Sequence, residues 1–207
     1  MDEFLAMPRK SKPHGRPFVF GVSCAFSNNK NCELLMEAFA REFGNSPKVR
    51  LKIHSPWNFY ADKVQSKLAQ LKVDTIDLNV KSLSWRSYID YMSSLDCYVL
   101  VSKGEGFSVT PREALALGIP CIISNNSAHK TLCESGFVYP VAAEIPEKHN
   151  GEFYGEPCGS RYTCALADVQ KALREVYNNF DLYLSKVEAG RQWVQRYHYE
   201  NIKKKYR

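Results

Sequence analysis

Short apolar runs recur along the chain and predict six β-strands. Four of the runs are apolar nearly throughout, which is typical of strands covered on both faces of a parallel sheet. The runs at residues 49–54 and 75–80 alternate between apolar and polar positions, so we expect them nearer an edge of the sheet. The predicted strands are residues 18–23, 49–54, 75–80, 97–102, 120–124 and 137–141.

Apolar residues at helical spacing lie between these runs. Ser84 is the expected N-cap of the third helix, and two further helices are expected at residues 166–178 and 182–195. The alternation of strand and helix predicts an α/β fold with a single Rossmann-like, doubly wound, mainly parallel six-stranded sheet. The three stripes are Leu34, Leu35, Ala38, Phe39 and Phe43; Val64, Leu68 and Leu71; and Tyr88, Ile89, Met92 and Leu95.

Ligands of such sheets bind beyond the carboxyl ends of the strands. The loops that follow Ser23, His54, Val80, Ser102 and Ser124 are therefore the places to look for a site. Residues 142–163 contain prolines and glycines and little periodicity, so we expect a long surface loop or lid there.

The 207 residues suffice for one large domain or two very small ones, and the sequence pattern favours one. We expect that domain at residues 17–207, preceded by a polar linker or expression-vector remnant at residues 1–16. Hydrophobic residues make up 44% and charged residues 24% of the chain, as in a soluble globular protein. No apolar run approaches the ~18 residues of a membrane span.

Charge and cysteine content narrow the compartment and the partners. The net charge of +6 would suit nucleic acid, membrane headgroups or anionic small molecules, and the simpler interpretation is a solvated basic tail at residues 203–207. The seven cysteines include no Cys-x-x-Cys pair, which favours a reducing, cytoplasmic compartment over disulfides or a zinc site.

The stretch SKGEGFSVTPREALALGIP, residues 102–120, predicts a strand, a Gly-rich turn and a helix. Thr110 as N-cap, Pro111 at the first helical position and Glu113 three residues after Thr110 form a capping box. The loop could expose the backbone N–H groups of four residues to a phosphate at the positive end of the helix. Those residues are Gly106, Phe107, Ser108 and Val109.

Two carboxylates, Glu105 and Glu113, flank this anion site. Carboxylates repel phosphate, so they fit only if they accept hydrogen bonds from hydroxyl groups. A ligand with both phosphates and hydroxyls, such as a nucleotide sugar, suits the arrangement. The alternative is that Glu113 only caps the helix and Glu105 is solvated.

The segment from Glu105 to Pro120 resembles the Glu-x7-Glu signature of retaining glycosyltransferases with the GT-B fold, family 4 most closely. The usual pattern is E-G-F-G-x-x-x-x-E-A-x-A-x-G-x-P, and Ser108 stands where a Gly is common. The resemblance extends to residues 20–39, 96–102 and 197–200. It implies the C-terminal, donor-binding half of a GT-B enzyme, with an N-terminal acceptor domain supplied in cis or in trans.

The resemblance also implies roles for individual residues. Glu105 and Lys30 are the expected catalytic residues: Glu105 contacts hydroxyls of the donor sugar, and Lys30 neutralises the pyrophosphate. The backbone of residues 106–109 contacts sugar and phosphate, Glu113 binds the ribose hydroxyls, and Ser82 and Leu83 read the base through backbone atoms. The expected partners are a nucleotide-sugar donor and a glycan, lipid or protein acceptor, as in polysaccharide biosynthesis. No metal, other cofactor or nucleic acid is expected, and peripheral membrane association is compatible with the charge.

The chain departs from the family where many members carry a Gly-Arg pair that supplies a second pyrophosphate contact. Cys24 and Ala25 stand there, so either Lys30 works with backbone donors alone or another cation, Lys103 or Arg112, replaces the Arg. The departure leaves two alternatives open: a non-catalytic nucleotide-sugar-binding or interaction module, and a sugar-nucleotide epimerase or phosphorylase relative.

Of the other conspicuous side chains, His129 is interpreted as a surface histidine at a helix start, and Trp57, Trp85 and Trp193 as packing residues.

Overall fold

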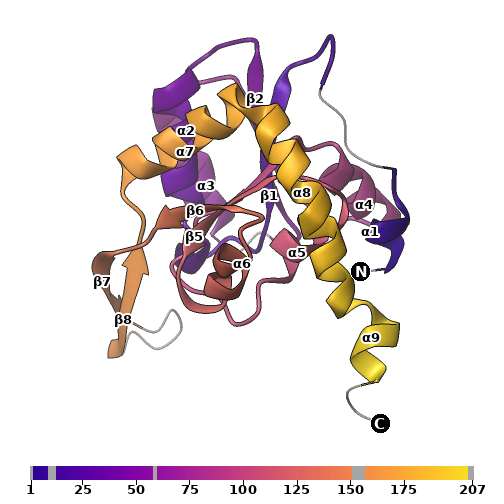
Figure 1. The fold of residues 1–207 in the computed structure, drawn as a ribbon. Helices are drawn as coiled ribbons and strands as arrows, with labels where there is room; N and C mark the ends of the chain where they lie inside the picture. Colours follow the sequence, from indigo (N-terminus) through magenta and orange to yellow (C-terminus); the bar gives the residue numbers. More distant parts are fainter. Residues whose placement is uncertain (1, 9–12, 58–59, 151–156, 205–207) are drawn as a thin grey trace.

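A computed structural model describes residues 2–8, 13–57, 60–150 and 157–204. Its centre is a six-stranded parallel sheet with the strand order β3-β2-β1-β4-β5-β6 (Figure 1). The order reverses between β1 and β4, which confirms the predicted doubly wound, Rossmann-like topology. The strands are β1 Phe18–Ser23, β2 Val49–Ser55, β3 Ile76–Val80, β4 Cys97–Leu100, β5 Cys121–Asn125 and β6 Tyr139–Ala142.

The burial of the strands follows their hydrophobic pattern. Every residue of β1 and β4 is buried, whereas β3 lies at the edge and only its first residue is fully buried. β2 lies next to β3; its first four residues alternate between buried and half-buried positions, and its last three are buried. Both alternating strands were thus correctly expected towards one edge.

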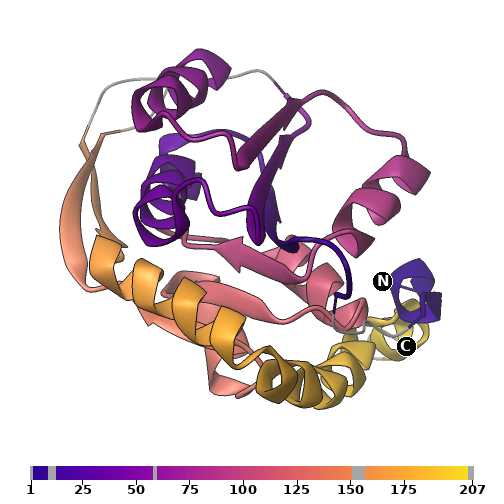
Figure 2. The same ribbon diagram turned by 90° about the horizontal axis from the view of Figure 1, so that it is seen from above.

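Helices cover both faces of the sheet (Figure 2). α2 packs against α3 and α7, and α5 packs against α8 and α1. The two C-terminal helices confirm the prediction closely, and the side chain of Ser84 accepts a hydrogen bond from the backbone N–H of Ser87, as an N-cap should. The helices are α1 Asp2–Ala6, α2 Cys32–Phe43, α3 Ala61–Leu71, α4 Trp85–Ser93, α5 Val109–Ala116, α6 Lys130–Glu134, α7 Leu166–Asn178, α8 Phe180–Val194 and α9 Tyr199–Lys203, with 3₁₀ turns η1 Asn28–Lys30, η2 Ser127–His129 and η3 Gln195–Tyr197.

The N-terminal segment was expected to be a polar linker, but its first residues pack on the domain. Phe4 in α1 is fully buried, with its ring centroid 5.3 Å from that of Trp85 in an edge-on contact. Arg191 of α8 donates hydrogen bonds to the carbonyls of Leu5 and Met7. The four consecutive apolar residues at 4–7 are too short a run to show helical periodicity, so the sequence pattern did not indicate this packing. Residues 1 and 9–12 lie outside the described part of the chain.

The stretch at residues 142–163 was expected to be a surface loop or lid, and this expectation is wrong for the part that the structure describes. It forms an antiparallel hairpin of β7 Ile145–Asn150 and β8 Pro157–Thr163, separate from the central sheet. Its strands were missed because polar and charged residues replace the usual apolar alternation. Residues 151–156 lie outside the described residues.

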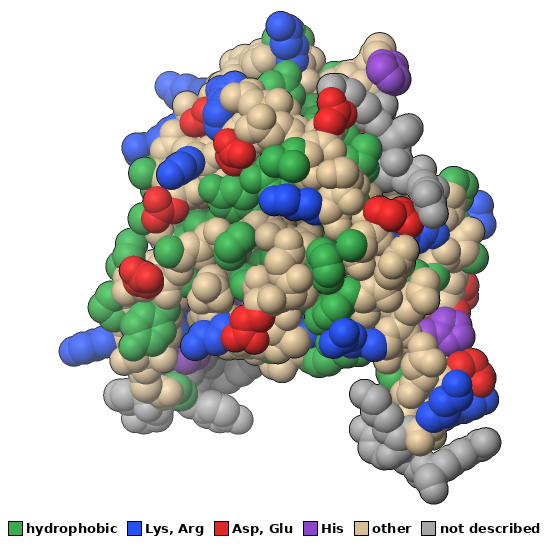
Figure 3. Space-filling view, viewed as in Figure 1, with side chains coloured by type: hydrophobic (Ala, Val, Ile, Leu, Met, Phe, Trp, Pro, Cys, Tyr) green, Lys and Arg blue, Asp and Glu red, His purple; other side chains and the backbone are tan. Residues whose placement is uncertain are grey.

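None of the helices in the described ranges is long and apolar enough to cross a membrane. On the face shown in Figure 3, Lys and Arg side chains are dispersed among acidic and neutral ones rather than gathered into one patch. The predicted basic tail lies partly outside the described residues, which end at Lys204.

Candidate functional site

The loops after β1 and β4 meet where the strand order reverses. The side-chain amide of Asn29 donates to the carbonyl of Gly104 over 2.5 Å, and the backbone N–H of Lys103 donates to the carbonyl of Asn29 over 2.8 Å. These contacts fasten η1, which carries Lys30, to the Gly-rich turn before α5.

Lys30 and Glu105 form an ion pair at this junction. The Nζ of Lys30 lies 2.7 Å and 2.8 Å from the two carboxylate oxygens of Glu105. The side chain of Glu105 is only 8% exposed and that of Lys30 is 24% exposed. The structure therefore brings the two predicted catalytic residues together, although 75 positions separate them in the chain.

The loop after β5 fixes the backbone of Glu105 from the other side. The N–H of Glu105 donates to the hydroxyl of Ser127 over 2.7 Å, and the N–H of Ala128 donates to the carbonyl of Glu105 over 3.3 Å. Three loops that follow parallel strands thus hold Glu105, which gives its carboxylate a defined position.

The predicted capping box of α5 is wrong. α5 begins at Val109, Ser108 is the N-cap residue, and no side chain caps the helix. The hydroxyl of Thr110 instead accepts a hydrogen bond of 2.6 Å from Tyr98. The carboxylate of Glu113 accepts a hydrogen bond of 2.7 Å from Tyr88. Glu113 is therefore not used for capping, which removes the simpler of its two interpretations.

Ser108 adopts the left-handed conformation, with φ of 62° and ψ of 73°. A glycine is unstrained in this region and a serine is not, which explains physically why the related pattern has Gly here. The hydroxyl of Ser108 donates a hydrogen bond of 2.6 Å to Nε2 of His129. This bond compensates for the backbone strain.

His129 is completely buried, so its interpretation as a surface histidine is wrong. Its Nδ1 lies 3.0 Å from the carbonyl of Ser124, which can only accept, so the proton of the neutral ring is on Nδ1 and Nε2 is the acceptor for Ser108. Burial lowers the pKa of His129 to about 4. The buried ring therefore links the loop after β5 to the start of α5 in its neutral form.

Replacement of Ser108 tests the balance between strain and hydrogen bond. We expect Ser108→Ala to lower the free energy of unfolding by about 1–2 kcal/mol, because it keeps a side chain in the left-handed region and loses the bond to His129. We expect Ser108→Gly to be nearly neutral, because relief of the strain offsets the lost bond. Urea unfolding of both variants measures this difference, and equal stabilities would contradict it.

Arg112 orients the backbone between Phe107 and Val109. Its Nη1 donates to the carbonyl of Phe107 and, over 2.8 Å, to that of Ser108. The N–H of a trans peptide points away from its C=O. The N–H groups of Ser108 and Val109 therefore point away from Arg112. This orientation leaves two of the predicted phosphate donors unobstructed by the guanidinium group.

Neither cation suggested as a replacement for the missing Arg is free to act as one. Arg112 is buried and lies over the ring of Phe107 at 4.1 Å. Lys103 lies 2.7 Å from the carboxylate of Glu147 in β7 and donates to the side chain of Asn28 over 2.8 Å. Both side chains hold the local structure together in the arrangement seen here.

A cavity of about 420 Å³ opens at the carboxyl ends of β1, β2 and β3. Ser82 and Leu83, the residues predicted to read a base, line it together with Ala25. Trp57 and Trp85 also line it and are 60% and 49% exposed. The interpretation as a packing residue is therefore wrong for Trp57, whereas Trp85 both packs against Phe4 and faces the cavity. Tryptophans that face a cavity are typical of stacking platforms.

His54 and Tyr88 complete the polar lining of this cavity. Nε2 of His54 donates to the carbonyl of Lys81 over 2.9 Å, and its Nδ1 then accepts from the hydroxyl of Ser23 over 2.8 Å. Burial lowers the pKa of His54. Sequence reasoning missed His54 and Tyr88 as cavity residues, and the position of His54 just before a strand end was the one signal available.

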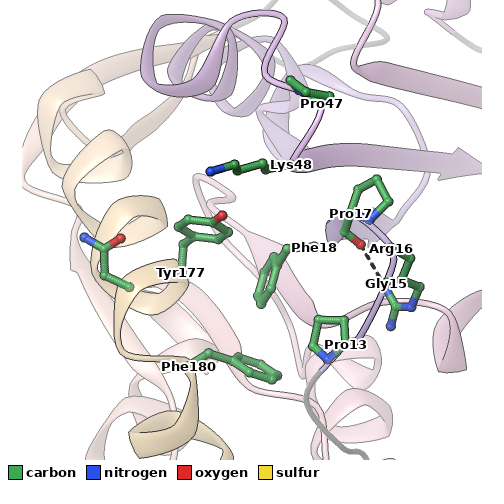
Figure 4. Close-up of a pocket in the computed structure, with 10 residues that line it drawn as sticks. Pro13, Gly15, Arg16, Pro17, Phe18, Pro47, Lys48, Tyr177 and Phe180 are labelled. Carbon is green, nitrogen blue, oxygen red and sulfur yellow. Dashed lines mark hydrogen bonds between the residues drawn. The ribbon is translucent and has the colours of Figure 1, made fainter.

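A larger cavity of about 690 Å³ lies at the opposite, amino-terminal edge of the sheet (Figure 4). Phe18, Lys48, Tyr177 and Phe180 line it. Arg16 at its rim is held by the fully buried Asp96 through two bonds of 2.7 Å. Since doubly wound sheets bind ligands at the carboxyl edge, the smaller cavity is the better candidate.

The family profile described as "Glycosyl transferases group 1" matches residues 17–148. The chain belongs to this family. No curated protein sequence matches it.

Solved glycosyltransferase structures share the fold. Alr3699/HepE from Anabaena, crystallised with UDP-glucose, has a TM-score of 0.66 at 14% identity, over 87% of this chain and 44% of that one. The C-terminal domain of LpcC, a glycosyl transferase group 1 family protein from Francisella tularensis, has a TM-score of 0.66 at 16% identity, over 89% of this chain and 88% of that one. Sucrose-phosphate synthase from Thermosynechococcus elongatus has a TM-score of 0.68 at 17% identity, over 89% of this chain and 42% of that one.

The chain thus spans less than half of the length of Alr3699/HepE and most of the LpcC domain. Within the described residues of this glycosyl transferase group 1 chain, no group of three His, Cys, Asp or Glu side chains could hold a metal ion. That the reaction needs no metal or other cofactor stays a prediction.

Proposed function

We propose that the chain is the donor-binding part of a retaining glycosyltransferase that uses a nucleoside-diphosphate sugar. The observation that carries the proposal is the Lys30–Glu105 pair at the point where the strand order reverses. A cavity with tryptophan walls lies on the same edge of the sheet, and Glu113 contacts its lining through Tyr88. Family membership supports the same assignment.

The arrangement suggests how a donor would be held. The base would stack in the cavity between Trp57 and Trp85, against Ser82 and Leu83. The ribose hydroxyls would bind Glu113, and the diphosphate would lie at the start of α5, against the backbone of residues 106–109.

The same placement suggests how sugar transfer would be assisted. As the bond between the sugar and the phosphate oxygen breaks, negative charge builds up on the diphosphate. Lys30 would stabilise that charge because it is already fixed beside the site. Glu105 would exchange part of its pairing with Lys30 for hydroxyls of the donor sugar.

Transfer also needs an acceptor site, which we assign to a second domain in cis or in trans. The chain's 44% span of Alr3699/HepE supports this division. We further propose a glycan, lipid or protein acceptor, as in polysaccharide biosynthesis, a mechanism without metal, and a cytoplasmic protein with peripheral membrane association and no nucleic-acid partner.

Calorimetric titration with UDP-, GDP- and ADP-sugars tests the donor proposal. We expect saturable, one-to-one binding of at least one of them, and competition by the matching nucleoside diphosphate. Absence of binding for all three, with a folded protein by circular dichroism, would contradict the proposal.

A non-catalytic nucleotide-sugar-binding module is the second candidate. It is favoured by the lack of a second cation where related chains carry an Arg. Ala25 lines the cavity, and Lys103 and Arg112 are both engaged elsewhere. Turnover of the two-domain enzyme, reconstituted from this chain and the acceptor domain, separates the two candidates. If the chain is a non-catalytic module, the donor binds but no nucleoside diphosphate is released as product, and Glu105→Ala changes only the affinity for the donor.

A further inference from the structure

Tyr88 joins the cavity to the carboxylate of Glu113. It lies in α4, one turn after the cap Ser84, and its ring packs against Trp85 at 5.8 Å and Phe4 at 6.2 Å. The ring lines the 420 Å³ cavity, and its hydroxyl donates to Oε2 of Glu113 over 2.7 Å. One side chain therefore contacts both parts of the site that we assign to the nucleoside.

The contact leaves one oxygen of Glu113 for a ligand. Among the described residues, Tyr88 is the donor to Oε2 and none donates to Oε1. Burial raises the pKa of Tyr88, so its hydroxyl stays protonated and remains a donor. Burial also raises the pKa of Glu113, and the hydrogen bond from Tyr88 opposes that rise.

A hydrogen bond to one carboxylate oxygen restricts the rotation of the group and so directs the other oxygen. The adjacent 2′- and 3′-hydroxyls of a ribose are donors that such an oxygen can accept. A 2′-deoxyribose would leave part of this half-buried carboxylate unpaired, and sites built to bind a hydroxyl discriminate strongly against analogues that lack it.

We propose that Tyr88 is a positioning residue that fixes Glu113 for the 2′-hydroxyl of the donor ribose, so that the site selects ribonucleotides over 2′-deoxyribonucleotides. The inference rests on the proposed function. It adds to the ribose contact of Glu113 the residue that orients this carboxylate and so sets its preference for ribose over 2′-deoxyribose.

The test is calorimetric titration of the native chain and variants with UDP, GDP and ADP and with their 2′-deoxy forms. The native chain should prefer the ribose form of its nucleotide by about 10-fold or more. Tyr88→Phe keeps the ring packing and removes the hydroxyl, and it should reduce that preference by about 10-fold. The readout is the ratio of two affinities, which a general loss of stability does not change.

Tyr91→Phe is the matched control. Tyr91 lies on the same helix, and its hydroxyl donates to the backbone carbonyls of Val22 and Lys52, away from Glu113. This variant loses a hydroxyl with two hydrogen bonds, but it should keep the native ratio. A double-mutant cycle adds a second measurement: in a Glu113→Ala background, Tyr88→Phe should not change the ratio further.

The outcomes separate the inference from the proposed function. The inference would be overturned if Tyr88→Phe kept the native ratio of ribonucleotide to 2′-deoxyribonucleotide affinity, or if the native chain bound the two forms equally. Either result would leave the proposed donor site unaffected. Equal losses in Tyr88→Phe and Tyr91→Phe would also overturn it. A native chain that binds no nucleotide would overturn both.

Discussion

Replacement of Lys30 by Met is expected to weaken the binding of the nucleoside diphosphate by about 100-fold, while the uncharged nucleoside binds as before. A hydrogen bond between charged groups contributes about 1.5–3 kcal/mol, and 1.4 kcal/mol corresponds to tenfold in affinity. The loss should reach the upper part of this range, because Glu105 would keep its charge beside the phosphates without its cation. Titrations of native chain and variant with both ligands measure the effect.

Lys67→Met is the control for this substitution. The side chain of Lys67 is 24% exposed, like that of Lys30, and it pairs with Glu37 over 2.7 Å, between α3 and α2. It should leave the affinity for the diphosphate unchanged. If Lys30→Met weakens the nucleoside and the diphosphate equally, the lysine supports the structure and does not bind phosphate.

The meeting of the loops that carry Lys30 and Glu105 could be predicted because it depends on topology. A parallel sheet brings the carboxyl ends of its strands to one edge, and the reversal between β1 and β4 places the loops after them side by side. Hydrophobic runs were sufficient to identify both strands. The sequence pattern therefore indicated the shared edge, the family resemblance supplied the two residues, and their ion pair was seen only in the structure.

The role of Glu113 could not be settled by local sequence. Thr110, Pro111 and Glu113 have the spacing of a capping box, yet the helix starts at Val109 and tertiary contacts take both polar side chains. Tyr88 and Tyr98, which bind them, come from α4 and β4. A local rule fails here because distant donors compete successfully for the same groups.

The tryptophan walls and the hairpin were missed for related reasons. Trp57 and Trp85 look the same in sequence whether they pack in a core or line a cavity, and only their exposure distinguishes the two. The hairpin of β7 and β8 is built on Glu147, which pairs with Arg161 across the strands and with Lys103 of the site loop. Such charged alternation gives no hydrophobic signal for strands.

The strain at Ser108 depends on a backbone angle that sequence does not state. A Gly at this position in the related pattern was a hint of left-handed backbone, but the partner that stabilises the serine, His129, lies 21 residues away. The hydrogen bond between them therefore had to be seen in the structure.

Acidification from pH 6.5 to pH 4 is expected to lower the free energy of unfolding through His129. Its pKa is about 4 in the folded chain and about 6.5 when unfolded. The unfolded state thus binds the proton first, so the stability that His129 contributes is complete above pH 6.5 and is lost as the pH falls towards 4. The loss should be about 3 kcal/mol, since each pKa unit corresponds to ~1.4 kcal/mol. His54, whose pKa burial also lowers, acts in the same direction.

Comparison of the native chain with His129→Gln isolates this contribution, because glutamine keeps polar atoms for Ser108 and Ser124 but does not titrate. The variant should be less stable at pH 7, and the gap in urea-unfolding free energy should close by about 3 kcal/mol between pH 6.5 and pH 4. The exposed His14 provides the control: His14→Gln should leave the pH dependence as in the native chain.

Because a protonated His129 cannot accept the hydroxyl of Ser108, acid should also weaken nucleotide binding at the start of α5. A gap that stays constant with pH would show that the folded chain admits the proton at His129, and the buried neutral link between β5 and the donor loop would then be wrong.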